Sequence, residues 1–428
     1  MADTLGSYPH FRLNFEQQGK RAKDLLKAAQ AGEPQALARF RSPPKLAEAQ
    51  YLIARELRFE NWAALKRHIA GMTRAREAMH TSVLDRDFRT LHIRCGHDLE
   101  TPLKEAGFSG DYYIDIYPYL SGPVREGPGS LEQRARHIVD CYGDQFDPPL
   151  EYEGQLRDLE DRERELHDSA AYEHVVLWFE HDVTDQLSLI HLLGHYATHR
   201  RPARLELVNI GDFPGTRRFT GLGELPPEAL RMLWATRKSV SAAQLQLGLA
   251  AWRALASPDP RPLAAIMRGG TRALPLLARA LHRHLRELPS LANGLSLTEQ
   301  LALTLMAEPL PHWDGIVSLG RIYSTLHWET DPLPGQGDAQ LRDRVLHMEG
   351  ASAPLFERRA GVGPDGKARP PWTDRLEITA LGRAVLKGDV DFMSLKPPPR
   401  WVGGVQIEAG MPDWRWDDKV KDAVRLGG

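Results

Sequence analysis

The stretch that most constrains the fold is His174–Gln186, with the sequence HVVLWFEHDVTDQ. It contains five consecutive apolar residues, Val175–Phe179, and then turns polar at Glu180–Asp182. A continuous apolar run of this length is typical of a strand covered on both faces of a parallel α/β sheet. Ligands of such sheets bind beyond the carboxyl ends of the strands, so the pattern predicts a functional site at the polar turn.

Segments on either side of this run predict more strands of the same sheet. Leu91–Cys95 and Leu205–Ile210 are predicted as short strands, and Asp111–Tyr117 alternates between polar and apolar residues. Helix-like segments, such as Leu187–Ala197, lie between them. Strands that alternate with helices favour right-handed crossovers and an open, mostly parallel sheet. We therefore expect an α/β, Rossmann-like ligand-site domain over residues 90–225.

The N-terminal region, residues 1–75, predicts a helical module. The sequence DLLKAAQAGEPQALARF, residues 24–40, resembles a degenerate ankyrin-type helix pair. Because a stable solenoid needs about three repeats, one or two units leave two interpretations open. Residues 18–70 form either a module that docks a partner protein or a cap packed on the next domain, and the cap is favoured.

The C-terminal half predicts a helical linker domain over residues 226–290 and a winged-helix-like domain over residues 291–428. Ser296 and Glu299 have the spacing of a capping box at the start of a helix. Winged helices bind DNA through a basic recognition helix or serve as packing domains. Between Trp313 and His327, Arg321 is the only lysine or arginine, and the basic stretch Arg279–Arg286 falls on another helix. Nucleic-acid binding is therefore the less favoured interpretation.

Composition narrows the environment. The formal net charge of −2 gives no general reason to expect nucleic acid or an acidic membrane surface as a partner. No apolar run approaches the ~20 residues that span a bilayer, so no membrane association is expected. Two cysteines, Cys95 and Cys141, are too few for a disulfide framework or a thiolate zinc site. These observations together predict a cytoplasmic protein.

Several motifs resemble an uncharacterised bacterial family, domain-of-unknown-function family 1835. They are LHIRCGHD, VVLWFEHDVTDQL, NIGDFPGTRRFTGLGEL, WATRKSVSAAQLQLGLAAW and the later LGRAVLKGD…RWVGGV. The resemblance covers about residues 90–417. It implies the same domain layout and the same choice of strand-end residues, and it brings no activity, cofactor or substrate.

Acidic residues gather at the expected strand ends: Asp98, Glu180, Asp182, Asp185 and Asp212. Clustered carboxylates suit Mg²⁺ or Mn²⁺, and they raise one another's pKa, which can make one of them a general acid. Helix capping is an alternative explanation for Asp98, Asp182 and Asp185, but it does not explain Glu180 or His181. We therefore predict Glu180, His181, Asp182 and Asp98 as catalytic residues, with Glu180 and Asp182 as metal ligands.

The predicted substrate-binding residues lie around the same strand ends. His97 adjoins a carboxylate, and Asp185 and Asp212 belong to the acidic set. Arg217 and Arg218 belong to a glycine-bearing loop that is either an anion-binding loop or an ordinary linker. The loop lacks both the GxGxxG and the GxxxxGK[ST] order.

A second pattern consists of three histidines at four-residue spacing, His191, His195 and His199. We favour a chance stripe on a half-buried helix over a zinc site as its explanation.

The sequence thus favours an enzyme or binder that acts on a phosphorylated or otherwise anionic small molecule. As an enzyme it would be a metal-assisted hydrolase or transferase, since no GxSxG elbow or other nucleophile motif is present. The alternative is a regulatory or adaptor protein that binds DNA or a partner protein through its terminal regions. Its DNA-binding form predicts salt-sensitive retention on DNA that depends on Arg279, Arg283 and Arg286.

Overall fold

The computed structural model of the chain describes residues 8, 10–216, 218–362, 367, 369–408, 411 and 413–427. The chain divides into two compact units, and each is built from three separate segments. The first unit contains residues 1–114, 171–180 and 202–239, and the second contains residues 115–170, 181–201 and 240–428. The predicted four-domain boundaries differ from this division and stay a prediction.

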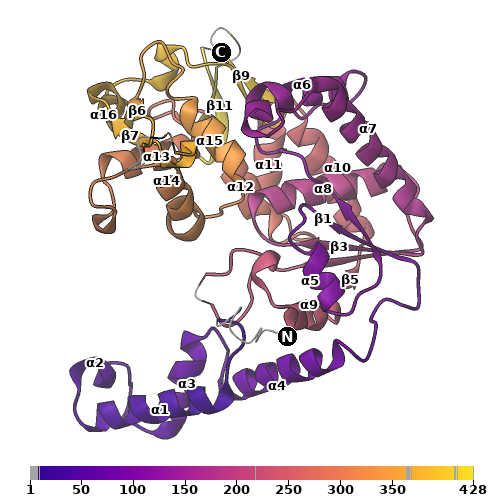
Figure 1. Cartoon of the computed structure of the whole chain (residues 1–428), viewed down its shortest axis with the longest axis vertical. Helices are drawn as coiled ribbons and strands as arrows, with labels where there is room; N and C mark the ends of the chain where they lie inside the picture. Colours follow the sequence, from indigo (N-terminus) through magenta and orange to yellow (C-terminus); the bar gives the residue numbers. More distant parts are fainter. Residues whose placement is uncertain are drawn as a thin grey trace. The chain divides into compact units, whose positions relative to one another are not determined.

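The first unit is organised around a five-stranded sheet (Figure 1). Its strands are β1 (Thr90–Arg94), β2 (Asp111–Ile114), β3 (His174–Phe179), β4 (Arg204–Asn209) and β5 (Lys238–Ser239). Their order is β2-β1-β3-β4-β5, with the first four parallel and β5 antiparallel to β4. The predicted open, mostly parallel, Rossmann-like sheet is therefore confirmed.

The apolar run predicted as a buried strand is the middle strand of this sheet, and all six residues of β3 are buried. Its register places Leu177 beside Ile93 of β1 and beside Leu207 of β4. On one face, Trp178 packs in an apolar cluster with residues of α5 (Glu100–Glu105) and α9 (Pro227–Trp234). Burial of this strand by tertiary contacts explains why its sequence lacks the polar alternation of a half-exposed strand.

The strand order creates a topological switch point between β1 and β3. The chain continues from β1 to β2 on one side and from β3 to β4 on the other side. In open α/β sheets the crevice at the carboxyl ends of two such strands is the usual ligand site. Here those ends are Arg94 and Phe179, so a ligand site is expected among the residues that follow each strand.

The N-terminal helices belong to the first unit and appear in indigo in Figure 1. They are α1 (Phe15–Gln30), α2 (Pro34–Leu37), α3 (Leu46–Glu56) and α4 (Trp62–Ala78). α4 packs against α9, where Arg12 and Arg76 both form ion pairs with the fully buried carboxylate of Glu228, at 2.8 Å and 2.5 Å. The helices are thus anchored to their own unit. The cap interpretation, the ankyrin-type resemblance and the docking of a partner stay predictions.

The second unit is mainly helical. Its helices are α6 (Ser130–Tyr142), α7 (Tyr152–Asp168), α8 (Val183–Thr198), α10 (Ala242–Leu255), α11 (Arg261–Gly269), α12 (Leu277–Leu285), α13 (Leu297–Ala307), α14 (Leu319–Thr325), α15 (Asp338–Leu346) and α16 (Ala380–Lys387). α8 and α10 approach closely because Gly248 has no side chain, and a Cβ there would lie 2.4 Å from the Cβ of Leu193. The capping box predicted at Ser296 and Glu299 is confirmed at the start of α13.

Within the described part of the second unit, three antiparallel strand pairs accompany these helices. They are β6 (Phe356–Arg359) with β7 (Arg375–Ile378), β8 (Arg400–Val402) with β9 (Val405–Ile407), and β10 (Asp413–Asp417) with β11 (Asp422–Leu426). The winged-helix interpretation of this region stays a prediction. The strand predicted to reach Tyr117 ends at Ile114, because the next side chain, Asp115, is buried and accepts hydrogen bonds from Ser188 and His191 at 2.5 Å and 3.1 Å.

Candidate functional site at the strand ends

A buried ion pair connects the two strands at the switch point. Arg94 is the last residue of β1, and Glu180 directly follows β3. An Nη2–Oε1 distance of 2.8 Å joins them, and their side chains are 4% and 5% exposed. The sequence pointed to Glu180 but not to Arg94, although a lone arginine within the apolar stretch LHIRC was a signal that a partner carboxylate was required.

The loop that enters α9 covers the second oxygen of Glu180. The backbone N–H of Leu222 donates to Oε2 of Glu180 at 2.9 Å. A Cβ at Gly221 would lie 2.5 Å from Oε1 of Glu180, and a Cβ at Gly223 would lie 2.7 Å from Oδ2 of Asp98. The two glycines therefore allow the backbone to approach the acidic groups, a contact that the residue pattern alone did not indicate.

Asp98 contributes to the same charged group. Its Oδ2 lies 3.0 Å from Nη2 of Arg94, and its side chain is 37% exposed. The capping alternative does not hold for Asp98, because Leu99 occupies the N-cap position of α5 and no side chain caps that helix. His97, which was predicted to bind substrate, is exposed. Its Nδ1 lies 3.7 Å from Oε2 of Glu100, so the ring points to a surface carboxylate.

The turn after β1 is held in place from the neighbouring strand. Tyr112 of β2 donates its hydroxyl hydrogen to the carbonyl oxygen of Gly96 at 2.7 Å. Burial, with the nearby carboxylate of Asp98, raises the pKa of Tyr112, so this hydroxyl keeps its proton throughout the physiological range. The turn that carries Asp98 is thereby attached to the sheet.

A second acidic group lies within one short stretch of chain, residues 180–185. One ligand atom from each of Glu180, Asp182 and Asp185 lies within 4.8 Å of the other two. Glu180 and Asp185 are buried, and Asp182 is 9% exposed. Such a cluster has the donor chemistry of a hard divalent cation. The capping alternative also holds for Asp182, because its Oδ1 accepts from the backbone N–H of Asp185 at 2.8 Å.

The other predicted site residues are placed differently. Asp212 was expected in the acidic set, but its exposed side chain forms a 3.0 Å ion pair with Arg58, so surface pairing explains it. Neither Asp98 nor Asp212 belongs to the three-carboxylate group found among the described residues. His181 and Arg218 are half-buried. Arg217 lies outside the described residues.

Comparison with known proteins supplies no identity. No protein-family model matches the chain, and no curated protein sequence matches it either. No helix in the described part of the chain has the length and hydrophobicity needed to cross a lipid bilayer. A function for this chain therefore has to be inferred from the chemistry of the strand-end residues.

Proposed function

We propose that the protein binds an anionic, phosphorylated small molecule at the strand ends of its sheet, with Mg²⁺ or Mn²⁺ held by Glu180, Asp182 and Asp185. The observation that carries the proposal is the convergence of these three carboxylates within 4.8 Å of one another beside the topological switch point. Oxygen ligands from two or more carboxylates are what Mg²⁺ and Mn²⁺ prefer, and these cations commonly keep positions for phosphate oxygens.

The surrounding residues have distinct roles in this proposal. Arg94 orients Glu180 through their 2.8 Å ion pair, and the N–H of Leu222 fixes the second oxygen of the same carboxylate. A bound cation would polarise a phosphoryl oxygen, which is the chemistry of a hydrolase or transferase. In this proposal Arg218 binds the anion and His181 transfers a proton, the roles that the sequence predicted for them.

Membership of residues 90–417 in domain-of-unknown-function family 1835 is likewise a proposal, supported by motifs such as LHIRCGHD and VVLWFEHDVTDQL.

The sharpest test separates metal binding from helix capping at Asp182. Asparagine caps helices about as well as aspartate, so Asp182→Asn keeps the start of α8 but removes one charged ligand. We expect this variant to bind Mn²⁺ at least about tenfold more weakly than the wild type, since a charged ligand is lost. Calorimetric titration of the purified full chain with Mn²⁺ and Mg²⁺ measures this.

Two controls complete the test. Asp212→Asn removes a carboxylate outside the cluster and should leave the Mn²⁺ affinity unchanged. The unfolding midpoint of Asp182→Asn without metal should stay close to that of the wild type, because the cap is retained. Equal Mn²⁺ affinity of the wild type and Asp182→Asn, or no binding by the wild type, would reject the proposal.

The adaptor alternative receives less support from the geometry. Its DNA-binding form relied on Arg279, Arg283 and Arg286. The side chain of Arg283 is only 2% exposed and is paired with Asp331 and Glu287 at 2.7 Å and 2.6 Å. An arginine that is buried in two ion pairs has no surface with which to contact a phosphate backbone.

A further inference from the structure

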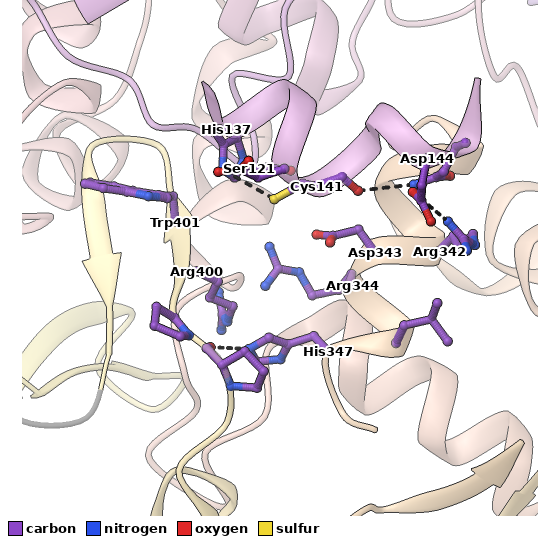
Figure 2. Close-up of a pocket in the computed structure, with 15 residues that line it drawn as sticks. Ser121, His137, Cys141, Asp144, Arg342, Asp343, Arg344, His347, Arg400 and Trp401 are labelled. Atoms are coloured by element: carbon purple, nitrogen blue, oxygen red, sulfur yellow. Dashed lines mark hydrogen bonds and ion pairs between the residues drawn. The ribbon is translucent and has the colours of Figure 1, made fainter. Parts of the chain in front are cut away.

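A cavity in the second unit contains two buried arginines that the proposed function does not use (Figure 2). It has a volume of about 520 Å³, which is within the range of small-molecule sites. α6, α15 and the start of β8 form its walls. We call it the arginine cavity and define it by His137, Arg342, Arg344, His347 and Arg400.

Arg400 is the most informative residue of the arginine cavity. Its side chain is only 6% exposed, yet none of its three guanidinium nitrogens has a hydrogen-bond partner among the described residues. The nearest carboxylate oxygen, Oε1 of Glu299, lies 3.9 Å from Nε, which is too far for a hydrogen bond. A buried arginine offers five N–H donors, and leaving them without acceptors is costly. Acceptors are therefore needed from outside the chain.

The neighbouring acids do not supply those acceptors. Burial alone would raise the pKa of Glu299, but Arg400 and His347 outweigh it and hold that pKa well below its usual range, so Glu299 is a carboxylate. One of its oxygens lies 2.9 Å from Nδ1 of His347, and the other accepts from the backbone N–H of Ser296 at 2.7 Å. Glu299 thus balances charge near Arg400 while its own hydrogen bonds go elsewhere.

Arg344 presents a second donor beside Arg400. Its side chain is 6% exposed, its Nε has no hydrogen-bond partner among the described residues, and the nearest carboxylate oxygen, on Glu287, is 3.8 Å away. In Figure 2 the side chains of Arg344 and Arg400 lie near each other below the helix that carries Cys141. Burial lowers the pKa of Arg400 to about 10, and the nearby positive charge of Arg344 contributes to this shift.

The cavity is accessible from the surface. Asp140, Asp144 and Pro399 are exposed, whereas Arg344 and Arg400 are buried, so the arginines lie at its inner end. Arg342 is engaged near the rim, 3.6 Å from Asp144. Burial lowers the pKa of His137 to about 4, so this histidine is neutral at pH 7 and adds no positive charge. The donors that remain are those of the two inner arginines.

We propose that the arginine cavity binds the phosphate group of a small phosphorylated molecule, with Arg400 and Arg344 donating hydrogen bonds to its oxygens. The planar fork of an arginine matches two oxygens of a phosphate, and the Nε–H of a second arginine can reach another. The three terminal oxygens of a phosphate monoester can accept hydrogen bonds from more of these N–H groups than the two oxygens of a carboxylate can. This binding site does not depend on the proposed cation site or on any metal.

The test uses the full chain in buffer that contains EDTA and no phosphate. Isothermal titration with inorganic phosphate, ribose 5-phosphate and succinate measures binding. We expect one-to-one binding of both phosphates and much weaker binding of succinate. Arg400→Met should weaken phosphate binding at least about tenfold, as expected for the loss of charged hydrogen-bond donors. The exposed Arg272, changed to Gln, provides a matched control that should bind like the wild type.

Two further variants keep the test decisive. If Arg400→Met does not fold, Arg400→Lys keeps the charge but loses the fork, and it should also bind phosphate at least about tenfold more weakly. Asp182→Asn should bind phosphate like the wild type, which separates this cavity from the strand-end site. Absence of phosphate binding by the wild type, unchanged binding by a folded Arg400 variant, loss of binding in Asp182→Asn, or succinate binding as tight as phosphate binding would each overturn the proposal.

Discussion

The guanidinium of Arg94 lies 2.8 Å from the carboxylate of Glu180, and both side chains are almost completely buried. A buried ion pair of this kind is a weak source of stability, because the cost of removing both charges from water offsets their attraction. An apolar pair would join β1 and β3 about as well. The position of the pair, at the switch point where parallel sheets bind ligands, is therefore better explained by a role in positioning Glu180.

Removing one member of this pair should be severely destabilising. Arg94→Met leaves Glu180 as a buried charge without its arginine, and we expect a loss of about 3–5 kcal/mol in the free energy of unfolding. Urea unfolding followed by circular dichroism measures it. Glu180→Gln in the same chain should restore much of the loss, because glutamine is neutral and still accepts from the N–H of Leu222.

The exposed pair Lys104–Glu100, at 3.1 Å, provides the comparison. Lys104→Met should cost far less unfolding free energy than Arg94→Met, since exposed ion pairs contribute little. If Arg94→Met cost no more than Lys104→Met, the ion pair would be unimportant for the fold.

The glycine that contacts Glu180 should not tolerate a side chain. Gly221→Ala would place a Cβ 2.5 Å from Oε1 of Glu180 and displace either the carboxylate or the loop that donates from Leu222. We expect a loss of about 1–3 kcal/mol in unfolding free energy, the cost of a disrupted buried hydrogen bond. Thermal and urea unfolding both report it.

Gly154 offers a matched control, because it lies on the charged helix α7 and a Cβ there would meet nothing within 4 Å. Gly154→Ala should stabilise the protein by about 0.5–1 kcal/mol, through the higher helix propensity of alanine. Similar effects of the two substitutions would mean that the approach of Gly221 to Glu180 is not tight.

A buried histidine should make stability depend on pH. His284 is 2% exposed, and burial lowers its pKa to about 4, from about 6.5 in an unfolded chain. Between these two values the unfolded chain binds a proton that the folded chain does not bind. Stability contributed by neutral His284 is therefore complete above about pH 6.5 and is lost as the pH falls toward 4.

His284→Leu should remove this dependence. The slope of unfolding free energy against pH between 4 and 6.5 should become shallower by about 1.4 kcal/mol per pH unit, the value for one proton. Urea unfolding at a series of pH values gives the slope, and the exposed His312, changed to Leu, is the control. An unchanged slope in His284→Leu would show that this imidazole is not responsible.

Arg283, one of the three arginines on which the DNA-binding form of the adaptor alternative depends, should prove structural. Arg283→Met leaves Asp331 and Glu287 buried without their shared partner, and it should cost about 3–5 kcal/mol in unfolding free energy. Arg279 and Arg286 instead contact Pro332 and Asp418 and are more exposed. Retention on a DNA column that falls in Arg279→Ala with Arg286→Ala, at constant fold, would revive the DNA-binding hypothesis.

Local residue patterns predicted four of the five strands of the sheet. The run Val175–Phe179 predicted a buried parallel strand because burial on both faces leaves a direct trace in composition. The order of Asp182 and Asp185 similarly offered a helix cap as an alternative explanation, and the structure contains that cap at Asp182. The edge strand β5 was not predicted, because two residues, Lys238 and Ser239, leave no pattern in a sequence.

The charged contacts could not be predicted in this way. Arg94 meets Glu180 because β1 and β3 are neighbours, and strand order is a property of the whole sheet. Arg344 and Arg400 belong to a helix and a hairpin whose sequences contain no shared motif, and only their burial without acceptors indicates a site. In both cases the informative feature is the burial of an arginine, which only the folded structure shows.

The interleaving of the two units has a practical consequence for dissecting the protein. The chain leaves one unit for the other after Ile114, Ala170, Glu180, Arg201 and Ser239. A fragment that ends or begins anywhere between the first and last of these points would lack a segment of both units, so neither could be obtained by simple truncation. Synthesis on the ribosome would likewise have to reach β5, in the middle of the chain, before the first unit could close, and most of the second unit is made only after that point.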